Sequence, residues 1–463
     1  MRLRCIIAIV GMIGTMAPRA SPGQGRVAFE LARDTALIDE KVLISVTGAR
    51  PGAFVTVRLA LPDGSTSAAT FVADRAGRVA LATARPIAGA YSEPDAMGLF
   101  WSARAPAGPP RGAANRSPSA AMPAQLIAEI DGSPVAVDTA WRRAVSPDVK
   151  ITRVRESGVV GTLYEPPGDA RRPAVIVLPG SNGGTPPPMQ WPGALASRGY
   201  VVLSLAFFHE EGLAPELSNF PLEYFESAIT WLRARPSVQT DRIALLGTSR
   251  GAETALLVAA TFPRMVRAVV AIVPSSVAWT GCCDSVSRLL PAFTRRGTPV
   301  PHMPGDVSLE TSVSDFSRTA SIRQAPVYVH RLADTSAVRR SAIPVEQIAG
   351  PILLISGRDD GVWPSSLMAD QVVDRLKRRN FAFPYQHVAM PDAGHFILRP
   401  YTSTMDLNDQ LHPVSGRRND AGGTAVGTAR ARERALSEIL AFFDKHLKRN
   451  PASARTSTTR PSR

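Results

Sequence analysis

The sequence predicts a protein of two structural parts, an all-β sandwich of immunoglobulin-like type followed by a doubly wound, mostly parallel α/β domain. Residues 27–145 show short alternating apolar runs at intervals of roughly ten residues, separated by turn residues, as in β-sandwiches. Residues 150–448 instead alternate short continuous apolar runs with segments of helical period. With 463 residues the chain is long enough for both parts.

The first 22 residues resemble an export signal. Arg2 and Arg4 form a basic start, Cys5–Met16 is apolar, and small residues around Ala17–Ser21 offer a cleavage site. We therefore expect a periplasmic or secreted protein, and a cytoplasmic one if this interpretation is wrong. An uncleaved anchor is the alternative, but the apolar segment is short for a membrane span. We expect no stable span once the signal is removed.

In residues 27–145 the strands are predicted from alternating apolar residues, and the turns from Pro, Gly and Asp. The clearest strands are Val42–Val46, Phe54–Leu59, Ala69–Ala73 and Gly77–Leu81. Residues 103–121 are rich in Ala, Gly, Pro and Ser and are expected to form a loop or linker.

From residue 150 the predicted strands are apolar throughout, as strands buried on both faces of a parallel sheet must be. After an expected strand pair at 151–163, the strands are Ala174–Leu178, Tyr200–Leu205, Ile243–Leu246, Val266–Val273 and Ile352–Ser356. The helices are Trp191–Arg198, Pro221–Arg235, Ala252–Thr261, Met368–Arg379 and Arg430–Leu447. Residues 280–345 have little period and are expected to form a lid or insertion.

Composition excludes several classes of protein. Forty-four per cent hydrophobic and 20 per cent charged residues are typical of a globular chain. The net charge is +14, and part of it lies in residues 449–463, a basic tail expected to be disordered. Because no basic stripe interleaved with aromatics accompanies the tail, we expect a solvated end and no nucleic-acid partner. Cys282 and Cys283 are adjacent and indicate neither a disulfide framework nor a metal site.

A candidate nucleophile lies where the predicted strand Ile243–Leu246 meets the predicted helix Ala252–Thr261. The turn between them contains Gly247-x-Ser249-x-Gly251. In this context the pattern indicates a sharp turn that exposes the serine hydroxyl at the end of the sheet, beside a helix N-terminus that favours negative charge. A tight structural turn is the alternative interpretation.

A candidate acid and base follow in the order that this fold requires. Asp360, with Asp359 as the alternative, follows the strand Ile352–Ser356, where a carboxylate can orient a histidine. Both aspartates could instead cap the next helix. His395 lies in a turn further on, and it is the best general base among the seven histidines. The order Ser249, Asp360, His395 predicts an α/β hydrolase.

The oxyanion of an acyl-transfer reaction needs two backbone N–H donors. One is expected from Arg250, which follows the candidate nucleophile, and the other from Ser181 or Asn182 in the glycine-rich loop after Leu178. The same loop could be a phosphate cradle, but it lacks the Lys-Ser/Thr ending of a nucleotide site. No spacing of metal ligands is present, and no cofactor is expected.

With these residues assembled, the chain resembles a bacterial member, with a serine nucleophile, of the acyl-CoA thioesterase and bile acid-CoA:amino acid N-acyltransferase family. The resemblance covers nearly the whole chain after the signal. It is carried by Gly89–Ser102, which resembles a signature of that family, and by the segments Pro221–Phe225, Gly247–Glu253, Asp359–Ser365 and Ala393–His395.

The resemblance implies hydrolysis of an acyl-CoA thioester through an acyl-enzyme, with Ser249, Asp360 and His395 as the triad. Family members that transfer the acyl group to amino acids carry cysteine at the nucleophile position, so serine favours release to water. The rival functions are an exported serine esterase or peptidase of the same fold, an acyl-CoA:amino acid N-acyltransferase, and a non-enzymatic binding module. The expected partner is a small acyl thioester or ester.

Overall fold

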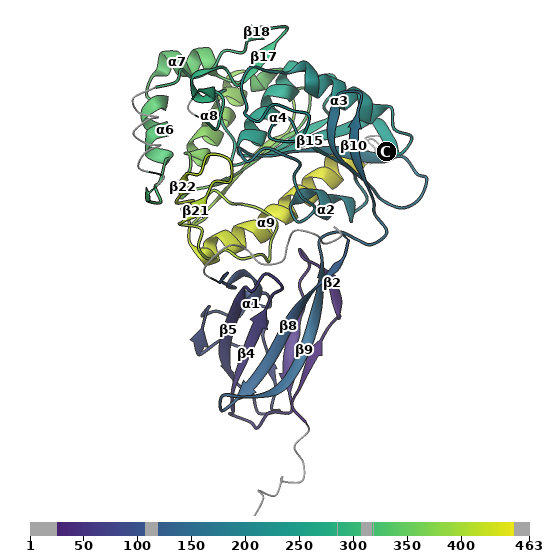
Figure 1. Ribbon diagram of the computed structural model, residues 1–463, viewed down its shortest axis with the longest axis vertical. Coiled ribbons are helices and arrows are strands. Elements are labelled where there is room, and N and C mark those ends of the chain that lie inside the picture. The colour runs from purple at the N-terminus through teal and green to yellow at the C-terminus, as the bar shows by residue number, and fades with distance from the viewer. Residues whose placement is uncertain (1–25, 107–118, 285, 307–316, 318, 449–463) are drawn as a thin grey trace, which may run out of the picture.

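The computed structural model describes residues 26–106, 119–284, 286–306, 317 and 319–448. The expected signal at 1–22 and the expected basic tail at 449–463 lie outside these residues, so both stay predictions. Figure 1 shows a β-rich part built from the first strands and a larger part in which helices cover a central sheet. None of the helices in the described segments has the length and apolar character needed to cross a membrane.

Two sheets make up the first part of the chain. One has the strand order β1-β3-β6, and the other has the order β2-β9-β8-β4-β5-β7, with the single parallel pair β2–β9. The strands are β1 Ala28–Leu31, β2 Thr35–Leu37, β3 Ile44–Thr47, β4 Phe54–Ala60, β5 Thr66–Val72, β6 Val79–Ala80, β7 Ala88–Gly89, β8 Ala121–Ile130 and β9 Ser133–Arg143. Val55, Val57 and Leu59 alternate into a core shared by the two sheets. The immunoglobulin-like classification of this part stays a prediction.

An eight-stranded sheet forms the centre of the second part, in the order β10-β11-β13-β12-β15-β16-β19-β20. The pairs β10–β11 and β11–β13 are antiparallel, and the other five pairs are parallel. Its strands are β10 Lys150–Glu156, β11 Val159–Glu165, β12 Arg172–Leu178, β13 Val201–Leu205, β15 Val238–Thr248, β16 Ala268–Ile272, β19 Ile352–Gly357 and β20 Tyr385–Met390. The sheet is therefore mostly parallel, as expected.

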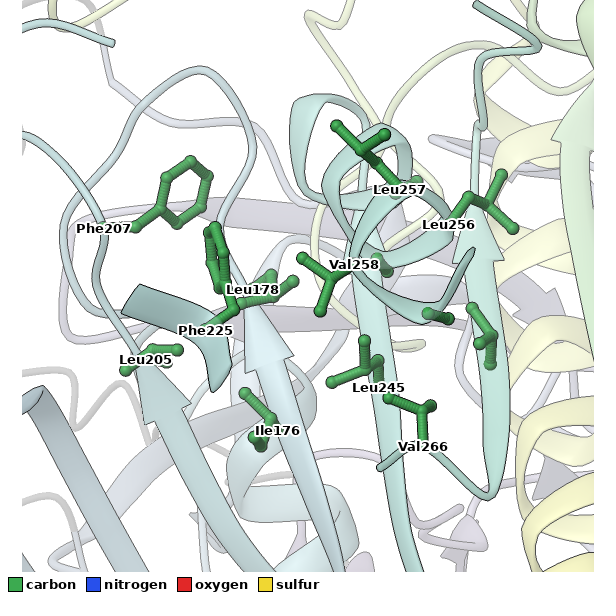
Figure 2. Close-up of a cluster of buried hydrophobic side chains, with 14 of the residues drawn as sticks. Ile176, Leu178, Leu205, Phe207, Phe225, Leu245, Leu256, Leu257, Val258 and Val266 are labelled. Atoms are coloured by element: carbon green, nitrogen blue, oxygen red, sulfur yellow. The ribbon is translucent and has the colours of Figure 1, made fainter. Parts of the chain in front are cut away.

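Helices cover both faces of this sheet because alternate residues of each strand point to opposite sides. Ile176 and Leu178 pack with α3 (Glu223–Arg233), α4 (Arg250–Thr261) and α8 (Ser365–Arg378). Figure 2 shows Leu256, Leu257 and Val258 of α4 in this layer. Val175 and Val177 pack on the other face with α2 (Trp191–Ala196) and α9 (Ala425–Phe443), which lie on the side of the β-rich part.

The segment expected to be a lid contains more regular structure than its sequence pattern predicts. It includes η1 (Ser287–Leu289), β17 (Phe293–Arg295), β18 (Thr298–Pro299), α6 (Ala325–Leu332), α7 (Thr335–Ser341) and η2 (Val345–Gln347). The remaining short elements are α1 Gly98–Trp101, β14 Phe220–Pro221, β21 Gln410–Leu411, β22 Arg418–Asn419 and the π-helical turn η3 Asp444–Lys448. Strand β14 pairs with β17, which attaches the segment to the main domain.

Candidate active site

Ser249 lies in a sharp turn between β15 and α4. Its backbone is held at φ 58° and ψ −120°, a conformation that costs a non-glycine residue about 1–3 kcal/mol. A Cβ atom at Gly247 would lie 1.9 Å from the Gly251 carbonyl oxygen, and one at Gly251 would lie 2.4 Å from that of Pro179. Only glycine fits at these two positions, so the Gly-x-Ser-x-Gly pattern reflects close contacts of the backbone with itself.

The structure brings the side chains of Ser249, His395 and Asp360 together, although they are far apart in the sequence. Ser249 Oγ lies 3.0 Å from His395 Nε2, and His395 Nδ1 lies 2.9 Å from Asp360 Oδ2 and 3.0 Å from Oδ1. All three residues are buried. Since Nδ1 faces a carboxylate, it carries the proton, which leaves Nε2 as the acceptor for the serine hydroxyl.

Asp360 also closes the turn that leads into α8. It accepts hydrogen bonds from the Val362 and Trp363 N–H groups and from Ser365 Oγ. The carboxylate therefore has a fixed orientation before it meets His395. Asp359, the alternative considered from the sequence, points elsewhere and forms an ion pair with Arg323 in which both side chains are more than 40 per cent exposed.

The three residues expected to bind the oxyanion differ in where they lie relative to Ser249. Arg250 is the first residue of α4, and N–H groups of a first helical turn have no acceptor within the helix. Gly180 comes so close to Ser249 that a Cβ atom built on it would lie 3.6 Å from the serine Cβ. Ser181 lines the cavity beside Ser249, whereas Asn182 is exposed and is absent from that lining. Of the two residues, Ser181 reaches this cavity and Asn182 does not, and the second oxyanion donor stays a prediction.

Two residues that the sequence did not single out for the site hold Ser181 in place. His412 Nδ1 accepts from the Val414 and Ser415 N–H groups, so its Nε2 carries the hydrogen and donates to Ser181 Oγ at 2.8 Å. The Cys283 thiol donates to the Ser181 carbonyl oxygen at 3.3 Å. A hydrogen bond to Cys282 and burial raise the pKa of the Cys283 thiol, which keeps it protonated as a donor. No motif marks either residue, because only the folded chain brings them to this loop.

A buried ion pair attaches the start of α4 to the segment that covers it. Arg250 donates to Glu253 Oε2 at 2.6 Å and to the Thr280 carbonyl oxygen at 2.7 Å. The Trp279 N–H donates to the other oxygen of Glu253 at 3.0 Å. Burial raises the pKa of Glu253 to about 7, although Arg250 and the Trp279 N–H act in the opposite direction. These bonds fix residues 279–280 against the turn that carries Ser249.

This arrangement can activate a hydroxyl and stabilise the tetrahedral adduct of an acyl group. A serine within hydrogen-bond reach of a histidine that is itself oriented by a carboxylate is the geometry of nucleophilic acyl transfer. In the described parts of the chain, no group of three or more His, Cys, Asp or Glu residues is placed to hold a metal ion.

A mostly parallel sheet, a serine in a strand-to-helix turn and the order Ser, Asp, His define the protein as an α/β hydrolase. Two family models match the chain. The C-terminal model of the BAAT/acyl-CoA thioester hydrolases matches residues 220–449, and the N-terminal model of the same proteins matches residues 39–156. The chain belongs to this family of acyl-CoA thioester hydrolases and acyltransferases. A model of the X-Pro dipeptidyl-peptidases (S15 family) also matches residues 128–288.

Relatives with named activities are similar over most of their length. Acyl-coenzyme A amino acid N-acyltransferase 1 of Mus musculus is 30% identical, over 89% of this chain and 96% of that protein. The peroxisomal succinyl-coenzyme A thioesterase of Mus musculus is 30% identical, over 88% of this chain and 94% of that protein. Among solved structures, a puromycin-hydrolysing peptidase of Mycobacterium tuberculosis matches with a TM-score of 0.41 and 14% identity, over 87% of this chain and 54% of that one.

Proposed function

We propose that the protein hydrolyses acyl-CoA thioesters through an acyl-enzyme formed on Ser249. The observation that carries this proposal is the hydrogen-bonded series Ser249–His395–Asp360, with 3.0 Å between Ser249 Oγ and His395 Nε2, in a chain of the thioester hydrolase family. A hydrolase acting on thioesters agrees with the names of several relatives, which include acyl-coenzyme A thioesterases.

In the proposed first half-reaction, Ser249 Oγ attacks the thioester carbonyl carbon while His395 Nε2 takes its proton. The N–H groups of Arg250 and Ser181 stabilise the oxyanion of the tetrahedral adduct. When the adduct collapses, the carbon–sulfur bond breaks and His395 returns the proton to the departing thiolate. Asp360 stabilises the imidazolium form of His395 throughout.

In the second half-reaction a water molecule takes the place of the thiol. His395 accepts a proton from the water as its oxygen attacks the acyl-serine ester, and the same oxyanion site is used again. Collapse of the second adduct releases the carboxylic acid and returns the proton to Ser249. The proton transfers use Ser249, His395 and Asp360, which are already hydrogen-bonded to one another, so little reorganisation of these three is needed.

Transfer to an amino acid is the second candidate function. It is favoured by the similarity to acyl-coenzyme A amino acid N-acyltransferases over nearly their whole length. The serine nucleophile argues against it, because an oxygen ester is attacked by amines less readily than a thioester. Hydrolysis is therefore the main proposal, and a product that contains an added amino acid would overturn it.

An exported serine esterase or peptidase is the third candidate, and the match to the S15 peptidase model over residues 128–288 supports it.

The export signal at residues 1–22 and the immunoglobulin-like sandwich at residues 27–145 remain part of our proposal. N-terminal sequencing of the protein recovered from cell fractions tests the signal. A start near residue 22 in the periplasm or medium would support it, and an intact Met1 in the cytoplasm would contradict it.

The proposed function is tested by supplying purified protein with a panel of acyl-CoA esters, nitrophenyl esters and peptide substrates. We expect thioester turnover that falls more than about a thousandfold in Ser249→Ala. Ser204→Ala replaces a buried serine of β13, whose hydroxyl donates to the Pro186 carbonyl oxygen outside the candidate site, and serves as the control for nonspecific damage. Turnover of oxygen esters or peptides alone would retain the triad and exclude CoA thioesters as substrates.

A further inference from the structure

Large aromatic side chains line part of the cavity beside Ser249. They are Trp279, Tyr328 and Trp363, and we call them the aromatic wall. Neighbouring rings of the wall meet edge to face, with centroids 4.9 Å apart for Trp279 and Tyr328 and 6.0 Å apart for Tyr328 and Trp363. The Trp363 ring also lies 6.0 Å from the ring of His395, the candidate base. The aromatic wall therefore begins beside the candidate catalytic residues.

The remaining lining of the cavity is mostly polar. It includes Ser181 and His412, which are hydrogen-bonded to each other, and Gln324, whose amide donates to Asn419. The CoA half of a thioester carries polar and charged groups, whereas a simple acyl chain is apolar. An acyl chain that lies on the aromatic wall takes no hydrogen-bonding group of the protein away from its partner. We therefore expect the acyl chain on this wall.

Several contacts fix the orientation of Trp279. Its indole Nε1 donates to Ser275 Oγ at 2.9 Å, and its backbone N–H donates to Glu253 Oε1 at 3.0 Å. The guanidinium group of Arg331 lies over the ring, 4.8 Å from its centroid. Only 2 per cent of the residue is exposed. Rotation of the ring would leave a buried N–H group without its acceptor, so moving it aside for a longer substrate is costly.

Trp279 also belongs to a buried apolar cluster. Other members of this cluster are Met303, Leu332, Ala337 and Met368, none of which lines the cavity. The Trp279 side chain thus lies between the cavity and the cluster. A smaller side chain at this position would leave an apolar hollow next to the cavity, because packed neighbours collapse only partly into such a space.

The cavity beside Ser249 holds few atoms. Its volume is about 80 Å³, whereas an apolar cavity that binds benzene measures about 150 Å³. By the same ratio of volume to carbon atoms, the space holds roughly three carbons. Neither an aromatic ring nor a long alkyl chain fits while Trp279 is in place.

We propose that Trp279 determines the acyl specificity of the protein by closing the apolar side of the cavity, so that acyl groups of roughly three carbons are preferred. This inference rests on the proposed thioester hydrolysis and specifies its acyl group. The thioester carbonyl faces Ser249, and the short chain lies along the aromatic wall and ends at Trp279. Each further methylene must displace close-packed side chains, which lowers kcat/KM.

The experiment measures kcat/KM for straight-chain acyl-CoA esters from acetyl to decanoyl. We expect the native protein to prefer propanoyl-CoA over hexanoyl-CoA by at least about tenfold. In Trp279→Ala the ratio of hexanoyl to propanoyl turnover should rise by at least about tenfold, since each methylene buried in the hollow contributes about fourfold. A ratio unchanged by the substitution, or a native preference for the longest esters, overturns the proposal.

Matched variants separate loss of the Trp279 ring from general damage. Trp231→Ala removes the same kind of side chain from α3, where Trp231 is 7 per cent exposed and lies outside the cavity lining, and it should keep the native ratio. Trp279→Phe keeps an aromatic ring but loses the donor to Ser275, and it should still prefer propanoyl-CoA. If Trp279→Ala fails to fold, Trp279→Leu provides the same test because it retains more buried apolar surface.

Nitrophenyl esters of the same acids separate failure of this inference from failure of the proposed function. If Trp279→Ala shifts the preference among these esters but the native protein hydrolyses no thioester, the role of Trp279 stands and the thioesterase proposal falls. If thioesters are hydrolysed and the ratio does not shift, the reverse holds.

Calorimetric titration with hexanoate makes the same comparison without turnover. Hexanoate should bind Trp279→Ala at least about tenfold more tightly than the native protein, because the hollow buries its last methylenes. Equal affinity of the two proteins, or binding to neither, overturns the proposal.

Discussion

At the scale of single residues, two neighbouring aspartates have different environments. Asp360 is 6 per cent exposed and faces His395, while Asp359 forms a half-exposed ion pair with Arg323. Both follow β19, so their position in the sequence distinguishes them poorly. The turn after β19 directs one carboxylate inward and the other outward, and only the inward one can orient the histidine.

Replacing each aspartate separately tests this difference. Asp360→Asn should lower kcat by about a hundredfold to ten-thousandfold, because an amide cannot stabilise the imidazolium form of His395. Asp359→Asn should change kcat less than about threefold, since an exposed ion pair contributes little. Steady-state kinetics on one thioester suffices, and a larger loss in Asp359→Asn than in Asp360→Asn would contradict the assignment.

The lowered pKa of His412 should make the stability of the protein depend on pH. Its pKa is about 4 in the folded protein, lowered by burial and by Arg288 and Arg417, against an ordinary value of 6.5. Between these pH values the unfolded chain binds a proton that the folded chain does not, so the free energy of unfolding rises with pH across that window. His412→Gln should flatten this rise in urea unfolding measured from pH 4 to 7. His330→Gln, on the exposed face of α6, should leave the slope as it is.

At the scale of elements, the approach of α4 to the end of β12 sets the spacing of the candidate oxyanion site. A Cβ atom at Gly251 would lie 2.4 Å from the Pro179 carbonyl oxygen and 2.6 Å from that of Leu178. At Gly180 the nearest atoms would be 3.4 Å and 3.6 Å away, which is ordinary contact. A side chain at Gly251 would therefore push α4 away from the loop that follows β12.

Alanine at these two glycines should have different effects on stability. Gly251→Ala should reduce the free energy of unfolding by about 1–3 kcal/mol or more, because backbone atoms must move to relieve the overlap. Gly180→Ala should stay within about 1 kcal/mol, since its new methyl group has room. Urea unfolding of both variants provides the comparison, and equal losses would show that the close packing of α4 on this loop is unimportant.

The strands and the nucleophile turn were predictable from sequence, whereas the cavity was not. Continuous apolar runs such as Ala174–Leu178 leave few alternatives to a buried strand, and β12 spans Arg172–Leu178. Helices α6 and α7 span only eight and seven residues, too few for a helical period to stand out in the sequence, so the segment is predicted only as a lid or insertion. Arg331, His412 and Arg417 meet through tertiary contacts, and no local pattern encodes such a meeting.

At the scale of the whole molecule, the β-rich part contacts the segment that carries His395, the candidate catalytic base. Arg399, four residues after His395, forms a buried ion pair with Asp39 at 3.2 Å and donates to the Ala144 carbonyl oxygen at 2.8 Å. Asp39 also pairs with Arg198 at 3.0 Å. Burial alone would raise the pKa of Asp39, but Arg399 and Arg198 outweigh it and hold the pKa below its ordinary value.

The segment Gly89–Ser102, which carries the family resemblance, belongs to the same junction. Trp101 donates from its ring nitrogen to Asp95, and its carbonyl oxygen accepts from the Thr404 N–H. The neighbouring Ala103 carbonyl oxygen accepts from Ser403 Oγ. The sequence marks this segment as distinctive. Its contact with residues 403–404 could not be predicted, because the two segments are far apart in the sequence and meet only in the fold.

Two ion pairs join the β-rich part to the α/β part, the buried pair Asp39–Arg399 and the exposed pair Asp406–Arg104. Breaking each separately tests whether the buried contact positions His395. Asp39→Asn should destabilise the protein by about 3–5 kcal/mol, because it leaves buried arginines without their counter-ion. It should also lower kcat by up to about a hundredfold through displacement of the His395 segment. Asp406→Asn breaks the exposed pair with Arg104 and should cost less than about 1 kcal/mol. Unaltered kcat in a folded Asp39→Asn protein would show that the β-rich part does not position the histidine.

Mass spectrometry of acid-quenched protein shows directly whether Ser249 carries the acyl group. Protein mixed with a short acyl-CoA for milliseconds is digested with trypsin, which separates the nucleophile peptide Ile243–Arg250 from the peptide Ala268–Arg288 that contains Cys282 and Cys283. We predict that the acyl mass is added to Ile243–Arg250 and is lost in Ser249→Ala. An acyl group on the cysteine-containing peptide, or full turnover by Ser249→Ala, would contradict an acyl-enzyme on Ser249.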